Sequence, residues 1–353
     1  MMKNLDIELL KTICETPGAP GFEKRIRDFV INTITPLVDE FSVDNMGNLV
    51  AVKRAVKGQV SEKKVMVAAH LDEIGFIVTH IDDQGFLRFH TLGGFDPKTL
   101  TAQRVIVHGK KDLVGVMGSK PIHVMSVEER ATLPKTTDFF IDLGMSKKEV
   151  EEIVSVGDAV TRQRELIEMG NCVNCKSIDN RISVYILIEV LKGIQFFPYD
   201  FYAVFTVQEE MGARGAVLAS HSVNPDFAIA LDTTIAYDVP GAKPQEMITQ
   251  LGKGAAIKLI DSSVISDRRL VAYLKQTATE NNITWQTEIL TGGNTDAGPM
   301  QRSGKLGAIA GAISIPTRHI HQVIEMADKG DIIAVIDLLE KAVSGLDKFD
   351  WAH

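Results

Sequence analysis

Acidic and imidazole side chains follow the apolar stretches of this sequence at several separate places. Four apolar runs lead to such residues: Val65–Ala69 to His70 and Asp72, Phe201–Val207 to Glu209 and Glu210, Phe227–Leu231 to Asp232, and Ala308–Ile315 to His319 and His321. A further acid, Asp179, precedes a stretch with helical spacing, Asn180–Ile194. Carboxylates and imidazoles bind divalent cations and transfer protons, so these residues are candidates for metal-assisted or acid–base chemistry.

The elements that must position these residues have the pattern of an α/β protein. Val65–Ala69 is almost continuously apolar, which indicates a strand buried on both faces of a parallel sheet. Helical segments alternate with such runs: Leu5–Cys14, Glu23–Ile34, Asn180–Ile194, Leu270–Asn281 and Asp331–Leu346. We also predict a strand over Val43–Val52. The pattern favours a three-layer α/β/α domain, and in open α/β sheets ligands gather beyond the carboxyl ends of the strands.

Between these regions the pattern changes to short β-rich pieces. They are punctuated by glycine and proline and interrupted by one helix, which begins at Ser146 with Glu149 as its capping box. The expected strands are Phe86–Leu92, Arg104–His108, Leu113–Met117, Asp138–Leu143 and Ala159–Arg164. We therefore predict a discontinuous α/β/α domain, residues 1–73 and 166–353, with a small barrel-like β-rich domain inserted at residues 74–165.

Several carboxylates at one edge of a sheet would repel one another without a counter-charge. A pair of divalent cations supplies that charge, and a mixture of Asp, Glu and His ligands suits zinc, cobalt or manganese better than calcium. Two ions held about 3.5–4 Å apart by a bridging carboxylate and a water lower the pKa of that water and polarise a carbonyl group. The sequence therefore predicts a site for a pair of divalent metal ions.

Other polar residues have simpler explanations. A single histidine or acid at a strand end is most often a solvated or hydrogen-bonded residue, whereas Glu209 beside Glu210 after an apolar strand is difficult to explain structurally. Cys172 and Cys175 form a C-x-x-C pair, but a second pair is missing, so we do not favour a zinc or redox role. No chemistry is assigned to His80, His90, His108, His123 and His221.

The composition excludes several classes of protein. The chain has 353 residues, a net charge of −8 and 45% hydrophobic residues, which is typical of a soluble globular protein. Its longest run without charged residues, Leu306–Thr317, is shorter than the roughly 20 residues that a membrane span needs. No signal peptide is recognisable, and three cysteines fit a reducing cytoplasm. We expect a cytoplasmic protein that binds neither membranes nor nucleic acid.

Six motifs resemble one known family over nearly the whole chain. The sequence is similar to the glutamyl aminopeptidase and tetrahedral (TET) aminopeptidase family of di-metal metallopeptidases, some of whose members are labelled deblocking aminopeptidase or endoglucanase. The motifs are Ala69–Gly75, Asp179–Arg181, Gln208–Gly212, Leu231–Thr233, Gly293–Ala297 and Arg318–His321. The resemblance implies an enzyme that releases N-terminal residues from short peptides, using two zinc or cobalt ions, or manganese, per subunit.

The resemblance also implies roles for individual residues. His70 and Asp232 would bind one metal ion, Glu210 and His321 the other, and Asp179 would bridge both. Glu209 would be the general base that activates the metal-bridging water, and the carboxylate of Asp72 would orient the ring of His70. Thr295 and Asp296 would line the substrate pocket.

Two residues depart from the usual last motif of the family. His319 stands where a tyrosine is usual, and Gln322 where a serine or threonine is usual, but His321 is present. The family further implies self-association into dimers through the inserted β-rich domain, and of dimers into a tetrahedral dodecamer.

Three alternatives remain at this stage. A deacylase or carboxypeptidase would use the same di-metal centre. A glycoside hydrolase of the endoglucanase type would use Glu209 with a second carboxylate and would need no metal ion. A scaffold without activity is disfavoured, because every proposed ligand and the base are present.

Overall fold

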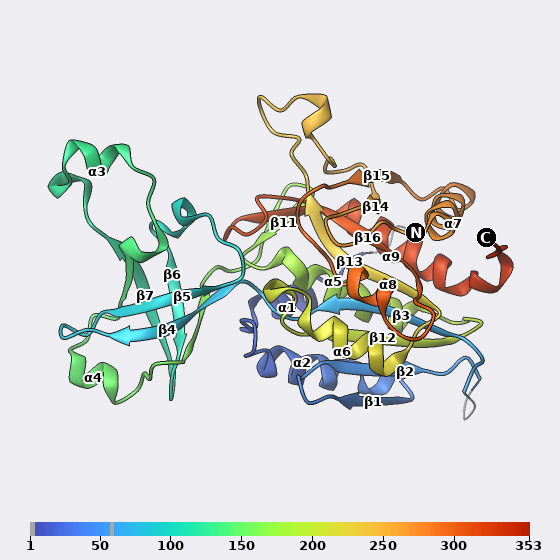
Figure 1. Ribbon diagram of the computed structural model, residues 1–353, viewed down its shortest axis with the longest axis horizontal. Helices are drawn as coiled ribbons and strands as arrows, with labels where there is room; N and C mark the ends of the chain where they lie inside the picture. Colours follow the sequence, from blue (N-terminus) through green and yellow to red (C-terminus); the bar gives the residue numbers. More distant parts are fainter. Residues whose placement is uncertain (1–3, 57–59) are drawn as a thin grey trace.

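The computed structural model describes residues 4–56 and 60–353, which form a large α/β body and a smaller β-barrel beside it (Figure 1). The strand order of the main sheet is β1-β2-β12-β3-β13-β16-β17-β11-β10, and β14 pairs with β16 and with β15. These strands are β1 Glu40–Val43, β2 Leu49–Lys53, β3 Lys64–His70, β10 Ile167–Met169, β11 Cys172–Cys175, β12 Asp200–Thr206, β13 Phe227–Ile235, β14 Ala255–Ile260, β15 Trp285–Ile289, β16 Ile309–Arg318 and β17 Glu325–Asp328.

Four neighbouring strands at the centre of the sheet, β12, β3, β13 and β16, are parallel. They are nearly completely buried, as the apolar runs predict for strands covered on both faces. Because they are parallel, their carboxyl ends lie at the same edge of the sheet. In the register, His70 at the end of β3 is paired with Thr206 at the end of β12.

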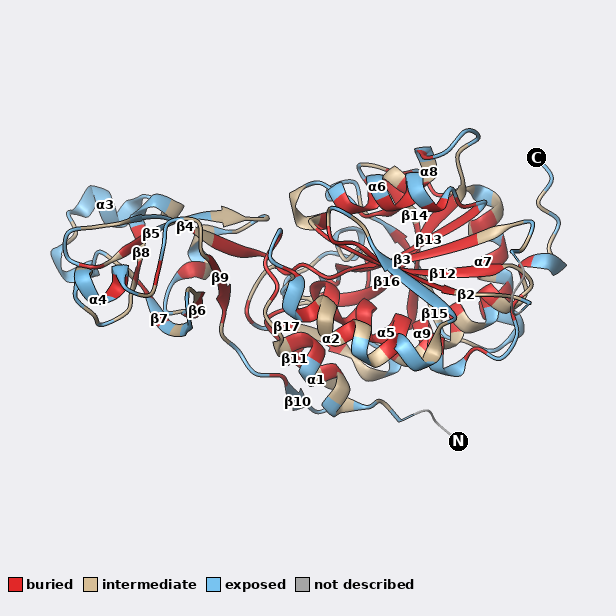
Figure 2. Cartoon of the chain, turned by 90° about the horizontal axis from the view of Figure 1, so that it is seen from below, coloured by how far each residue is buried: buried red, intermediate tan, exposed pale blue. Residues whose placement is uncertain are grey.

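Helices cover both faces of this sheet, so the predicted three-layer architecture is confirmed (Figure 2). One face packs against α1 Ile7–Glu15, α2 Lys24–Ile34, α5 Ile178–Gly193, α7 Arg268–Glu280 and α9 Lys329–Ser344. The other face packs against α6 Arg214–Val223 and α8 Ala297–Arg302. No helix in the described ranges is long and apolar enough to cross a membrane.

The prediction of one strand over Val43–Val52 is wrong, because this segment contains a turn between β1 and the antiparallel β2. One oxygen of Asp44 accepts hydrogen bonds from the amides of Met46, Gly47 and Asn48 at 2.9–3.0 Å, and Gly47 has a φ of +102°. An aspartate that caps its own turn, followed by a glycine at positive φ, is a signal that we overlooked.

The β-rich segment folds as a closed barrel in the order β4-β5-β8-β7-β6-β9. Its strands are β4 Gly75–Ile81, β5 Leu87–Leu92, β6 Arg104–His108, β7 Asp112–Ser119, β8 Phe139–Asp142 and β9 Ala159–Arg162. The predicted helix is α4, Lys147–Glu151, and its capping box joins Ser146 and Glu149. A second short helix, α3 Val127–Ala131, has the same capping pattern and was not predicted.

The two cysteines of the C-x-x-C pair do not face each other. They lie three residues apart on β11, so their side chains point to opposite faces of the sheet. The thiol of Cys175 instead donates a hydrogen bond to the main-chain oxygen of Arg164 at 3.8 Å, and all three cysteines are free. Neither candidate metal group found among the described residues contains a cysteine.

Candidate active site

Two groups of side chains that are suited to metal binding meet at the carboxyl edge of the parallel strands. In the first, Nε2 of His70 lies 3.4 Å from Oδ1 of Asp179 and 3.7 Å from Oδ1 of Asp232. In the second, Nε2 of His321 lies 3.4 Å from Oδ2 of Asp179 and 3.4 Å from Oε1 of Glu210. Asp179 therefore belongs to both groups, with a different oxygen in each.

The elements of the α/β body explain this convergence. His70 is the last residue of β3, Asp232 lies on β13, and Glu210 lies in the short helical turn after β12. Asp179 lies at the start of α5, where its backbone is not yet helical. His321 follows β16 in a turn and has a φ of +64°. His319 belongs to neither group, so the geometry favours His321 as the ligand.

The carboxylate of Asp72 holds the turn that carries both glutamates. Oδ1 accepts a hydrogen bond from the amide of Glu209, and Oδ2 accepts one from the amide of Glu210, each at 3.0 Å. We expected this carboxylate to orient His70, but the closer contact of Nδ1 of His70 is the main-chain oxygen of Asp72, at 3.0 Å, whereas Oδ1 lies at 3.6 Å. The main-chain oxygen of Asp72 therefore makes the closest contact with the ring of His70, while its carboxylate holds the amides of both glutamates.

Glu209 lies beside the first group but is not part of it. Its Oε2 is 3.9 Å from Nε2 of His70, and its Oε1 accepts a hydrogen bond from Nδ2 of Asn294 at 2.9 Å. Burial raises the pKa of the Glu209 carboxyl well above its usual value, although the nearby His70 opposes this shift. A carboxylate with a raised pKa that is near the site and outside the ligand groups is suited to proton transfer.

The loop before α8 holds the two residues that we expected, Asp296 and Thr295, and one that we did not, Asn294. Asp296 is buried, and its Oδ2 accepts a hydrogen bond from Thr206 at 2.6 Å. Thr295 is also buried and donates to Asp261 at 3.0 Å. Asn294, which contacts Glu209, lies in the Gly293–Ala297 motif, but nothing in its type or position distinguished it from its neighbours.

The electrostatics of the site show an excess of negative charge. Burial raises the pKa of Asp232 to about 7. Burial lowers the pKa of His321, but the carboxylates of Glu210 and Asp179 outweigh it and raise the pKa to about 11. The candidate metal ligands therefore share protons between them. Bound cations would supply the positive charge instead and remove the need for these protons.

The donor set fits two divalent ions. Oδ1 of Asp179 is buried and has no hydrogen-bond partner among the described residues, so this oxygen is free to serve as a ligand. Each group offers one imidazole nitrogen and two carboxylate oxygens within 4.8 Å of one another, the ligand chemistry of zinc, cobalt or manganese.

The barrel also reaches the site. A Cβ built on Gly94, in the loop after β5, would lie 3.4 Å from Nδ1 of His321. A Cβ built on its neighbour Gly93, whose φ is +96°, would lie 2.4 Å from a side-chain carbon of Ile74 and 3.4 Å from Cβ of Glu210. A side chain at Gly93 would clash with Ile74, whereas one at Gly94 would make ordinary contact with His321, so the loop after β5 lies against the site.

Several known proteins that are similar to this chain in sequence and fold are named aminopeptidases. A putative aminopeptidase of Acetivibrio thermocellus is 39% identical over 337 residues, which cover 95% of this chain and 98% of that protein. The structure of aminopeptidase APDkam598 from the archaeon Desulfurococcus kamchatkensis superimposes with a TM-score of 0.91 at 37% identity and covers 96% of this chain and 94% of that chain. The TET1 peptidase of Pyrococcus horikoshii, described as assembling into a tetrahedron or a large octahedral shell, gives a TM-score of 0.84 at 32% identity, with 96% and 98% covered.

The fold, the site and these likenesses together define a metallopeptidase of the aminopeptidase class, an enzyme that hydrolyses peptide bonds. Within this class, the chain belongs to the M42 glutamyl aminopeptidase family, whose model matches residues 47–338. The family predicted from the six motifs is thereby confirmed, and it implies divalent metal ions.

Proposed function

We propose that this aminopeptidase uses two divalent ions per subunit, zinc or cobalt, to remove N-terminal residues from short peptides. His70 and Asp232 would hold one ion, Glu210 and His321 would hold the other, and Asp179 would bridge them. The observation that supports this proposal is the position of the Asp179 carboxylate, whose two oxygens each lie 3.4 Å from Nε2 of a different histidine.

The residues of the chain divide the chemistry between them. The two ions, when bound, supply Lewis acidity, which acidifies water and polarises the peptide carbonyl group. Glu209 accepts a proton from the attacking water and passes it to the leaving amine, while Asn294 holds Oε1 of Glu209 and thereby fixes the orientation of the base. The hydrogen bond that the amide of Glu209 donates to the carboxylate of Asp72 keeps Glu209 in place beside the first group.

The buried pair Thr295 and Asp296 would support the substrate pocket from behind, since both side chains are bonded to the sheet and its loops rather than exposed. Asn294, next to them, would form the part of the pocket nearest to the base.

The experiment that tests this function compares two peptides with the same sequence, one with a free N-terminus and one with an acetylated N-terminus. We expect metal-loaded protein to hydrolyse only the free peptide, from its N-terminus, and to lose this activity after exhaustive chelation. Hydrolysis of the acetylated peptide at the acyl group would indicate a deacylase. Release of the C-terminal residue would indicate a carboxypeptidase, and activity that survives chelation would contradict the proposed metal centre.

We also propose that the barrel, within an inserted domain of residues 74–165, mediates self-association into dimers and further into a tetrahedral dodecamer. Large apolar side chains that would be costly to leave in water support this role, because each is at least 47% exposed on β7 or near α3. They are Val114, Val116, Ile122, Val124, Val127 and Leu133. Light scattering of the purified protein tests the assembly, and a mass of one subunit would contradict it.

A cytoplasmic location is part of the same proposal. It is supported by the three free thiols, of which Cys14 and Cys175 are buried. Fractionation of cells that produce the protein tests it, and recovery with the secreted proteins would contradict it.

A further inference from the structure

We propose that Glu325 is a positioning residue that holds two metal ligands, Asp179 and His321, at the spacing required for their ion. This inference rests on the proposed di-metal function. Glu325 begins β17, and it is not among the residues that the sequence motifs single out.

The two oxygens of Glu325 bind the main chain of both ligands. Oε2 accepts a hydrogen bond from the amide of Asp179 at 2.9 Å, and Oε1 accepts one from the amide of His321 at 3.0 Å. The side chain of Glu325 is completely buried. One rigid group therefore connects the start of α5 to the turn after β16, two segments that each supply a ligand to the second metal group.

A carboxylate suits this task because it offers two acceptor oxygens and no donor when ionised. The backbone of Asp179 is extended at the start of α5, and that of His321 has a φ of +64°, which is unusual for a residue with a side chain. A backbone such as that of His321 persists only where surrounding contacts fix it. Asp72 does the same for Glu209 and Glu210, so the main chain of four site residues is held by two buried carboxylates.

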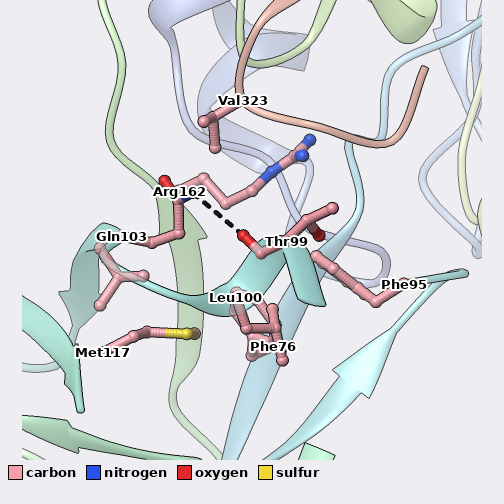
Figure 3. A pocket seen from close by; sticks show the side chains of 9 residues that line it. Phe76, Phe95, Thr99, Leu100, Gln103, Met117, Arg162 and Val323 are labelled. Carbon is pink, nitrogen blue, oxygen red and sulfur yellow. Dashed lines mark hydrogen bonds between the residues drawn. The ribbon is translucent and has the colours of Figure 1, made fainter. Parts of the chain in front are cut away.

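The barrel supplies the cation that accompanies this buried acid. Nη2 of Arg162, from β9, lies 3.8 Å from Oε1 of Glu325 and donates to the main-chain oxygen of Lys176 at 2.5 Å. Figure 3 shows Arg162 beside Phe95 and Val323 in a small cavity between the barrel and the α/β body. A buried carboxylate near a guanidinium costs less to ionise than an isolated one. The barrel is therefore part of the construction of the metal site.

The test measures the zinc affinity of Glu325→Gln by competition with a chelator. Glutamine keeps the shape but replaces one acceptor oxygen with an NH2 group, so one of the two amides loses its partner. Loss of such a supporting contact typically weakens metal binding about 10- to 100-fold, and we expect this loss for the ion at Glu210 and His321, with a smaller change for the other ion.

Asp331→Asn is the matched control. Asp331 is also buried and accepts two main-chain amides, from Gly252 at 2.8 Å and Gly254 at 2.6 Å, but these residues carry no metal ligand. We expect its zinc affinity to stay within about twofold of the wild type. Equal zinc affinity of wild type and Glu325→Gln, with both folded, would overturn the positioning role, whereas a wild type that binds no zinc would contradict the proposed function itself.

Glu325→Asp covers the case in which the glutamine variant does not fold. It keeps both oxygens but is too short to reach both amides, so we expect a folded protein with weakened zinc binding whose activity recovers in excess zinc. If both variants stay unfolded in excess zinc while Asp331→Asn folds, Glu325 is a general structural residue and the proposal is wrong.

Discussion

Oδ1 of Asp179 lies 3.4 Å from Nε2 of His70, although one residue starts a helix and the other ends a strand of the central sheet. The other oxygen of the same carboxylate lies at the same distance from His321. Burial disfavours the charged form of Asp179, but the two nearby histidines outweigh it and lower the pKa of the carboxyl. Each oxygen of Asp179 therefore faces a different group.

Glu209→Gln separates the role of the base from that of the ligands. Glutamine keeps the size of the side chain and the partner of Asn294 but cannot accept a proton. We expect kcat to fall about 10²- to 10⁴-fold, while the metal content measured by elemental analysis stays unchanged. Glu210→Gln, one residue away, should instead lose metal. Wild-type turnover of Glu209→Gln would show that another group is the base.

Asn294→Asp tests the contact between the loop before α8 and the base. A second carboxylate 2.9 Å from Oε1 of Glu209 raises the pKa of that base further, because like charges disfavour ionisation. Since the base must be ionised to act, we expect the acid limb of the kcat–pH profile to move to higher pH. Asn294→Ala, which removes the hydrogen bond without adding charge, should move it much less, and identical profiles for the two variants would contradict the contact.

Asp72→Asn tests how the glutamate turn is held. An asparagine side chain has one acceptor oxygen, so one of the two amides, of Glu209 or Glu210, loses its partner at a cost of about 1–3 kcal/mol in stability. We expect a lower melting temperature together with a lower kcat. A variant as stable as the wild type would show that these main-chain bonds contribute little.

Glu23 makes the stability of the protein depend on pH. Burial, reinforced by the charge of Asp72, raises the pKa of its carboxyl from 4.5 to about 7. The folded state therefore binds this proton more tightly than the unfolded chain. The stability that the group contributes is complete below pH 4.5 and is lost as the pH rises through 7, a change of about 3 kcal/mol.

Glu23→Gln cannot ionise and does not lose this stability. In the metal-loaded proteins, we expect the melting temperature of the variant to increase relative to that of the wild type as the pH rises from 5 to 8. A difference in melting temperature that does not change with pH would contradict the raised pKa.

The layers of the fold and the candidate metal ligands can be predicted from the sequence, because both are marked by local patterns of residues. Continuous apolar runs such as Val65–Ala69 identify the buried parallel strands, and an acid or histidine after each run identifies the edge at which they meet. The β-rich texture similarly predicts the insertion. The hairpin at Asp44–Gly47 is not predicted, because its short turn lies between apolar residues that continue the strand pattern on both sides.

The supporting contacts could not be predicted in the same way. Glu325 and Glu23 act through hydrogen bonds to backbone amides of distant segments, and a lone glutamate in a sequence gives no indication of its partner. The contacts of Asp72 with the glutamate turn could not be predicted for the same reason, because the placement of the turn after β12 decides which amides its carboxylate meets. In the sequence, Gly93 and Gly94 have the pattern of an ordinary turn. Only the folded structure shows that they lie next to Glu210 and His321.

The most direct test of the metal centre is anomalous diffraction at the zinc edge from crystals of zinc-loaded protein. We expect two peaks per subunit, about 3.5–4 Å apart, one next to His70 and Asp232 and one next to Glu210 and His321, with Asp179 between them. A single peak, or peaks bound away from Asp179, would contradict the proposed centre.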